Sequence, residues 1–112
     1  MALFNKLALA LVIGLGSASG WGEDEKTPLL IDTRSPAEYA AGHVEGAVLV
    51  PYDGIEAGIV KLTEDKAQPI YLYCGSGGRA EIARKSLLRR GYTQVTNLGG
   101  LADAQKFKES LP

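Results

Sequence analysis

The chain contains a single cysteine, Cys74, and the segment that it begins is the first feature that could do chemistry. Residues 74–79 read Cys-Gly-Ser-Gly-Gly-Arg. The reactive form of cysteine is the thiolate, and an ordinary thiol, with a pKa of about 8.5, needs local positive potential to ionise at neutral pH. Glycine tolerates a positive φ and lets backbone amides approach an anion closely. We therefore expect this loop to hold a sulfur anion, or an incoming oxyanion, in a ring of inward-facing amides.

The positive potential at this loop has two expected sources. A helix is predicted to begin at Arg79 or Ala80, and the free amides and the dipole of its first turn attract anions. Arg79 adds a permanent charge, and it would either position an anionic donor or brace the loop. We predict a catalytic Cys74 that is open to solvent. The predicted anion-binding residues are Gly75, Ser76, Gly77, Gly78 and Arg79.

The same residues could also have purely structural roles. A lone cysteine is often a small buried apolar residue, and a glycine-rich turn between a strand and a helix is common on its own. The loop lacks the lysine of a nucleotide-phosphate loop, and its glycines are out of frame for a dinucleotide-binding turn. One cysteine and one histidine cannot build a structural zinc site. We therefore expect neither a metal nor another cofactor.

The elements that would position the loop follow from the apolar pattern of the chain. Four short apolar runs predict strands at residues 29–32, 47–50, 70–73 and 95–98. Helical patterns follow at residues 36–41, 53–62, 79–90 and 101–109. Alternating strands and helices are typical of an α/β domain whose parallel sheet is covered on both faces. Ligands bind beyond the carboxyl ends of such strands, and Cys74 directly follows the third one.

The helix predicted at residues 36–41 has the clearest local signals. Ser35 can cap it, and Pro36 fits its first position. Glu38 completes a capping box with Ser35, and Gly42 ends the helix. These signals predict a short helix directly after the first strand.

The helix predicted at residues 79–90 has an apolar face with Ile82, Ala83 and Leu87, while its basic residues face solvent. This basic cluster is short and lacks interleaved aromatic residues. The net charge of the 112-residue chain is −1. The charge pattern therefore gives no reason to expect a nucleic acid or an anionic membrane as a partner.

Residues 1–20 have the pattern of a secretory signal peptide. Lys6 precedes an uncharged apolar run from Leu7 to Leu15, and small residues follow as far as Gly20. The run is short for a membrane span. We expect cleavage near Gly20, which would leave residues 21–112 as a single exported domain without stable membrane association. An uncleaved membrane anchor is the alternative.

Three parts of the chain resemble a known family. Residues 74–79 resemble the active-site loop of single-domain rhodaneses, often C-x-S-G-x-R. Segments within residues 30–47 look like the N-terminal signature of that family, and segments within residues 91–100 look like its C-terminal one. With the predicted signal peptide, the chain resembles the small periplasmic rhodaneses of bacteria. Family members often have a tryptophan a few residues after the Gly-Gly pair, where this chain has Ala104.

The resemblance implies a rhodanese-like three-layer α/β domain, with a central parallel sheet of four to five strands flanked by helices. It also implies a sulfurtransferase in which Cys74 takes the outer sulfur of thiosulfate, releases sulfite and holds the sulfur as a persulfide. Cyanide or a cellular thiol would then remove that sulfur. Amides of residues 75–79 would stabilise the persulfide anion. The loop has no lysine and no second arginine, so we expect modest affinity for dianionic thiosulfate.

The resemblance also suggests roles for residues outside the loop. Asp32 and Arg34 follow the first predicted strand, where the family uses similar residues to brace the domain, and we expect structural support from both. His43, the single histidine of the chain, could be imagined as a base for the thiol. The family places its Gly-His in a structural turn, which favours a structural role for His43.

Two further functions are alternatives to sulfur transfer. Phosphatases and arsenate reductases also use a cysteine in an anion-binding loop, but the common phosphatase spacing puts five residues between cysteine and arginine, and this chain has four. A non-catalytic sulfur carrier or binding module is the second alternative. Inactive modules of this kind typically lack the cysteine, which is present here. The spacing and the resemblance favour the sulfurtransferase.

Overall fold

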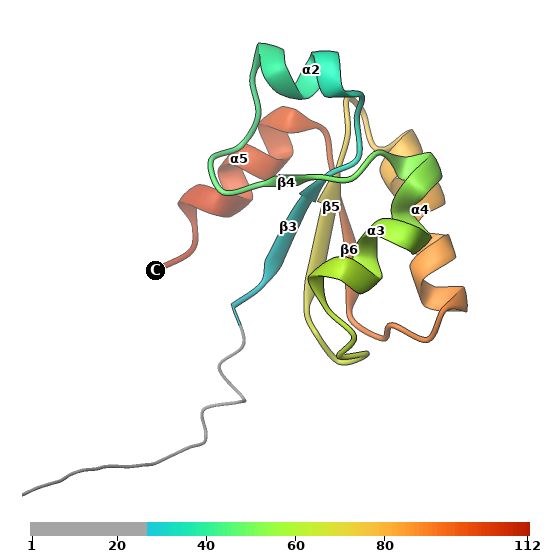
Figure 1. Ribbon diagram of the computed structural model, residues 1–112. Coiled ribbons are helices and arrows are strands. Elements are labelled where there is room, and N and C mark those ends of the chain that lie inside the picture. The colour runs from blue at the N-terminus through green and yellow to red at the C-terminus, as the bar shows by residue number, and fades with distance from the viewer. Residues whose placement is uncertain (1–26) are drawn as a thin grey trace, which may run out of the picture.

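The computed structural model describes residues 27–112 (Figure 1), and the predicted signal peptide lies outside these residues. The described residues form a four-stranded parallel sheet with the strand order β4-β3-β5-β6. Its strands are β3 (Leu29–Asp32), β4 (Val48–Leu49), β5 (Ile70–Tyr73) and β6 (Val95–Gly99). The predicted α/β class, with parallel strands, is confirmed.

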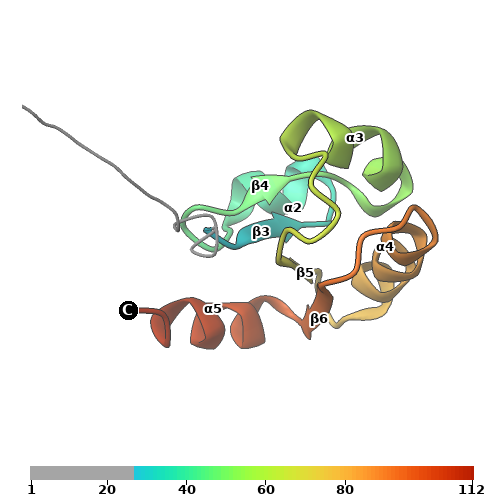
Figure 2. The same cartoon turned by 90° about the horizontal axis from the view of Figure 1, so that it is seen from below.

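Helices cover this sheet on both faces. They are α2 (Pro36–Ala41), α3 (Ile55–Leu62), α4 (Gly78–Arg89) and α5 (Leu101–Glu109), with a short 3₁₀ turn, η2 (Tyr52–Gly54), before α3. Figure 2 shows α3 and α4 on one side of the sheet and α5 on the other, so the predicted three layers are present. The short helix α2 lies beyond the carboxyl ends of the strands (Figure 1). No helix within residues 27–112 is long and apolar enough to cross a membrane.

The two faces of the sheet bury separate apolar clusters. The cluster under α3 and α4 includes Ile31 of β3 and Leu72 of β5. The cluster on the opposite face includes Tyr73 of β5 and Ala104 of α5. Burial on both faces explains why these strands are continuous apolar runs rather than alternating ones.

The register of β5 brings the ends of three strands together. Asp32 of β3 and Gly99 of β6 both pair with Tyr73, the last residue of β5. Just beyond, the Thr33 amide donates to the Tyr73 carbonyl over 2.9 Å, and the Cys74 amide donates to the Gly99 carbonyl over 3.0 Å. The loop after β5 therefore begins between the ends of its two neighbouring strands.

The capping box predicted for α2 is present. The Ser35 hydroxyl accepts from the Glu38 amide at 3.2 Å, and Oε1 of Glu38 accepts from the Ser35 amide at 3.0 Å. The helix begins at Pro36, as predicted, and ends before Gly42. The local sequence thus sets the position of Glu38, which the site uses.

Three elements differ from the predictions. Strand β4 has two residues rather than the four expected, and α3 begins after the turn η2 rather than at residue 53. In α4 the buried residues are Ala80, Ala83 and Leu87, and Ile82 is 53% exposed. The prediction that Ile82 faces the core was therefore wrong. The buried stripe follows steps of three and four residues, and Ile82 lies beside it.

Candidate active site

Cys74 lies in the loop that joins β5 to α4. Its Sγ accepts a hydrogen bond from the Gly77 amide at 2.9 Å. The amides of Ala80, Ser76 and Arg79 also interact with the sulfur. Helix α4 has no side-chain cap at its first residue, so its first amides need another acceptor. The sulfur of Cys74 takes the place that a capping oxygen has in other helices.

These contacts determine the ionisation of the thiol. Burial raises the pKa of Cys74, because a thiolate loses hydration away from water. Hydrogen bonds from the amides of Ala80, Ser76, Gly77 and Arg79 favour the anion and outweigh the effect of burial. The pKa of Cys74 is therefore lowered below that of an ordinary thiol. The site favours the nucleophilic form of the residue.

The thiol is less accessible than the sequence suggested. Cys74 is 1% exposed and belongs to the apolar cluster under α4, so the expectation of a thiol open to solvent was wrong for this conformation. The loop around it is exposed at Gly75, Ser76 and Gly78. The sulfur thus lies at the boundary between the core and an exposed loop. Reaction with a donor requires the loop, or a side chain beside it, to move.

Gly77 gives the loop its shape. Its φ of 106° and ψ of −16° lie in a left-handed conformation that other residues rarely adopt. The Gly77 carbonyl accepts from Nδ2 of Asn97 at 2.9 Å, and Oδ1 of Asn97 accepts from the Gly99 amide at 2.9 Å. A Cβ on Gly100 would overlap the carbonyl oxygen of Gly75. Strand β6 and the turn after it therefore support the loop directly.

Arg79 is held by Glu38 of α2. Its Nη1 donates to Oε1 of Glu38 at 2.8 Å and its Nη2 donates to Oε2 at 3.1 Å, which makes the pair bidentate. The hydrogen bonds from Arg79, and then those from Ser35, lower the pKa of Glu38 to about 2. Arg79 interacts more weakly with Cys74. Of the two roles open to Arg79, bracing of the loop is the arrangement present in this structure.

Asp32 and Arg34 form a second, more buried pair. Nε of Arg34 donates to Oδ1 of Asp32 at 3.0 Å, and Nη2 donates to Oδ2 at 2.8 Å. The Arg34 side chain also donates to the Gly42 carbonyl at 2.6 Å. The pair therefore links the end of β3 to the end of α2. These contacts agree with the structural support that we expect from Asp32 and Arg34.

His43 follows α2 in the chain and packs back on that helix. Its ring stacks on Tyr39 with the centroids 3.6 Å apart, and its Nδ1 lies 2.8 Å from the Tyr39 carbonyl oxygen. These contacts of His43 give no sign of a base for Cys74.

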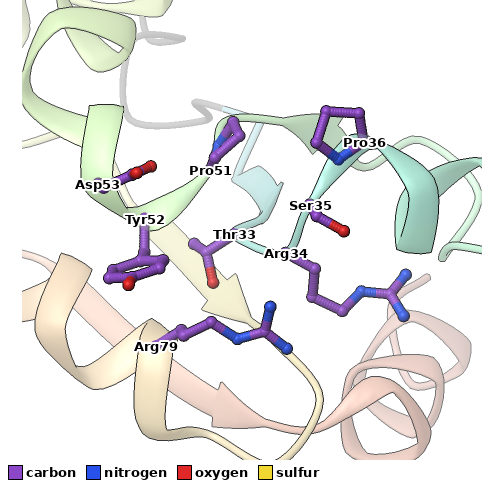
Figure 3. A pocket seen from close by; sticks show the side chains of 8 residues that line it. All are labelled: Thr33, Arg34, Ser35, Pro36, Pro51, Tyr52, Asp53 and Arg79. Carbon is purple, nitrogen blue, oxygen red and sulfur yellow. The ribbon is translucent and has the colours of Figure 1, made fainter.

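A pocket of about 320 Å³ opens beside the loop (Figure 3). Its lining comes from the turn between β3 and α2, from residues 51–53 and from Arg79. Cys74 is not part of the lining. Figure 3 shows the guanidinium of Arg79 directed along the pocket floor, whereas that of Arg34 turns away from Tyr52. Arg79 lines this pocket and also interacts with Cys74, so it is the link between the pocket and the sulfur.

Two residues of the site were missed by sequence reasoning. Glu38 was interpreted as part of a capping box and of the N-terminal family signature, and Asn97 as part of the C-terminal signature, but neither was expected to contact the loop. Glu38 lies 41 positions before its partner Arg79, and Asn97 lies 20 positions after Gly77, so no local pattern indicates either contact. No group of three or more metal-ligating side chains occurs within the part of the chain that the structure describes.

Comparison with known proteins agrees with this loop and this fold. Residues 19–106 match the model of the rhodanese-like domain. This chain belongs to the rhodanese family. The family resemblance seen in the sequence is thereby confirmed, and the matched range includes the loop that begins at Cys74.

Several known rhodanese proteins are similar over most of the chain. The thiosulfate sulfurtransferase PspE of Escherichia coli is 36% identical over 105 residues, which cover 90% of this chain and 92% of PspE. A solved structure described as a rhodanese with anions from E. coli has 35% identity and a TM-score of 0.66, and the match covers 69% of this chain and 91% of that one. A solved structure of a rhodanese-like domain from Anabaena has 28% identity and a TM-score of 0.63, and the match covers 77% of this chain and 97% of that one.

A larger relative shows that the domain also occurs in other enzymes. The tRNA uridine(34) hydroxylase of Yersinia enterocolitica is 35% identical over 92 residues. The match covers 77% of this chain but only 26% of the hydroxylase. This chain thus corresponds to about a quarter of that protein.

Gly77→Val should suppress sulfur transfer from thiosulfate to cyanide by about tenfold or more, because a β-branched residue cannot keep the left-handed backbone without strain. Its Cβ would also lie 3.4 Å from the Cα of Gly99. The matched control is Gly78→Val, since a Cβ at Gly78 meets nothing within 4 Å. Kinetic assays and thermal melts of both variants measure the effect. A folded Gly77→Val variant with wild-type activity would show that the left-handed conformation of Gly77 is not needed.

Proposed function

We propose that this protein is a sulfurtransferase that moves a sulfane sulfur from thiosulfate, or a similar donor, to cyanide or a thiol through a persulfide on Cys74. The main support is the set of backbone amides around Sγ, led by the Gly77 amide at 2.9 Å. These amides stabilise the thiolate at Sγ, and the persulfide, whose charge lies on the next sulfur, would draw on the same loop amides. PspE, a thiosulfate sulfurtransferase, aligns over nearly its whole length.

In the first step, the thiolate of Cys74 attacks the outer sulfur of thiosulfate. A new S–S bond forms at Sγ, the S–S bond of the donor breaks, and sulfite leaves with the electron pair. The persulfide keeps one negative charge on its terminal sulfur, so no proton has to move. The anion-binding loop, residues 75–79, would stabilise that charge through its amides and the dipole of α4.

In the second step, a nucleophilic acceptor attacks the terminal sulfur of the persulfide. Cyanide would leave as thiocyanate, and a thiolate acceptor would leave as a new persulfide; in both cases Cys74 returns as the thiolate. The enzyme alternates between two covalent states, so ping-pong kinetics should follow. Asp32 and Arg34 would support this cycle only by fixing the strand end and α2.

The alternatives have less support. A phosphatase uses its loop arginine to bind phosphate oxygens, but both terminal nitrogens of Arg79 donate to Glu38. The hydroxylase relative is about four times as long as the matched segment, so we do not propose its activity for this chain. A sulfur carrier without turnover would share the loop, and it differs from the proposed enzyme only in the second step.

Thiosulfate should add one sulfur, about 32 mass units, to the intact protein, because the persulfide is a covalent intermediate. Cyanide should remove the added mass, and Cys74→Ser should never acquire it. Intact-mass spectrometry before and after each reagent measures these changes. A protein that gains no sulfur from any sulfane donor would refute the proposed function. One that gains sulfur but turns over with no acceptor would be a carrier.

We also propose that residues 1–20 direct export, with residues 21–112 forming the mature domain in the periplasm. The support is the basic, apolar and small-residue order of that segment. N-terminal sequencing of protein made from the full chain in a bacterial host should find a new start near Gly20 in the periplasmic fraction. Full-length protein confined to the cytoplasm, or held in the membrane, would contradict this proposal.

A further inference from the structure

We propose that Glu38 is a specificity-determining residue. By holding Arg79, it keeps the site from favouring dianionic sulfur donors over monoanionic ones. The inference rests on the proposed function, because it concerns the donor that reacts with Cys74. Glu38 does not touch the reacting sulfur in this structure and would act through Arg79.

The orientation of Glu38 is fixed by its own helix. Oε1 accepts from both the amide and the hydroxyl of Ser35 at 3.0 Å, and from Nη1 of Arg79 at 2.8 Å. Oε2 accepts from Nη2 of Arg79 at 3.1 Å. The carboxylate therefore serves as a helix cap and as a clamp at the same time. The capping box aims a negative charge at the arginine of the loop.

The other arginines around the loop are paired as well. Arg34 contacts Asp32 at 2.8 Å, and Arg84 contacts Glu81 at 2.6 Å. Glu81 also accepts from Asn97, which supports the loop. Each of these guanidinium groups thus faces a carboxylate. The attraction that the loop offers to an anion comes mainly from its amides and from the dipole of α4.

The pairing of Arg79 with Glu38 affects how strongly the site attracts donors of different charge. A free guanidinium attracts a dianion about twice as strongly as a monoanion at the same distance. When a carboxylate balances the charge of the arginine, most of this preference for the dianion is lost. The Arg79 side chain in the pair is 35% exposed and that of Glu38 is 40% exposed, so solvent screening keeps the effect moderate. With a pKa of about 2, Glu38 remains ionised wherever the thiolate is present.

The test compares two donors of nearly equal size. Thiosulfate carries two negative charges, and methanethiosulfonate, in which a methyl group replaces one oxygen, carries one. Glu38→Gln retains an oxygen for the capping box but removes the charge. We expect the ratio of kcat/KM for thiosulfate to that for methanethiosulfonate to rise about three- to tenfold. Changes that affect both donors equally, such as exposure of the thiol, cancel in this ratio.

Glu56→Gln is the matched control, because Glu56 pairs with Arg90 at 3.6 Å on the surface of α3 and α4. It should leave the ratio unchanged. In an Arg79→Gln background, Glu38→Gln should raise the ratio by clearly less, because only the direct repulsion between the carboxylate and the donor remains. Thermal melts check that each variant folds.

An unchanged ratio in Glu38→Gln, or an equal rise without Arg79, would overturn the inference. Both results would leave sulfur transfer itself intact. Failure of the wild-type protein to take sulfur from either donor would instead refute the proposed function, so the two failures are distinct.

Discussion

The hydrogen bond from the Gly77 amide to the sulfur of Cys74 is the contact on which the site depends. It exists because Gly77 adopts a left-handed backbone directly before α4, which turns the first amides of that helix toward the sulfur. The helix gains an acceptor that its sequence otherwise lacks. The thiol gains donors that lower its pKa in spite of its burial. One backbone geometry thus provides an acceptor for the helix amides and favours the thiolate form of Cys74.

The rest of the fold holds that loop from three sides. Strand β6 supports it through Asn97, and the Gly100 turn packs on the carbonyl of Gly75. Helix α2 supports it through Glu38 and Arg79. Three parts of the fold therefore contact the loop, although its outer residues are exposed. Contacts of this kind keep the loop amides directed at the sulfur.

Sequence patterns predicted the parts of this structure that depend on neighbouring residues. The apolar runs located the strands, Ser35 and Glu38 marked the start of α2, and the glycines after Cys74 indicated an amide ring. The pairing of Glu38 with Arg79 could not be predicted, because it arises only when α2 packs over the strand ends. The 1% exposure of Cys74 also escaped prediction, since it depends on how α4 and the loop close over the sulfur. The exposed position of Ile82 also escaped prediction, since it depends on which side of α4 packs on the sheet.

The most direct test of this account is the ionisation of Cys74, followed by the ultraviolet absorbance of the thiolate as pH rises. Cys74 is the single cysteine of the chain, and subtracting the same titration of Cys74→Ser removes the absorbance of the five tyrosines. The folded protein should ionise at a lower pH than the protein unfolded in guanidinium, because the loop amides favour the anion. This contribution to stability should be complete above the unfolded pKa and should disappear as pH falls through the folded pKa. A folded thiol that ionises at the same pH as the unfolded one, or at a higher pH, would contradict the account.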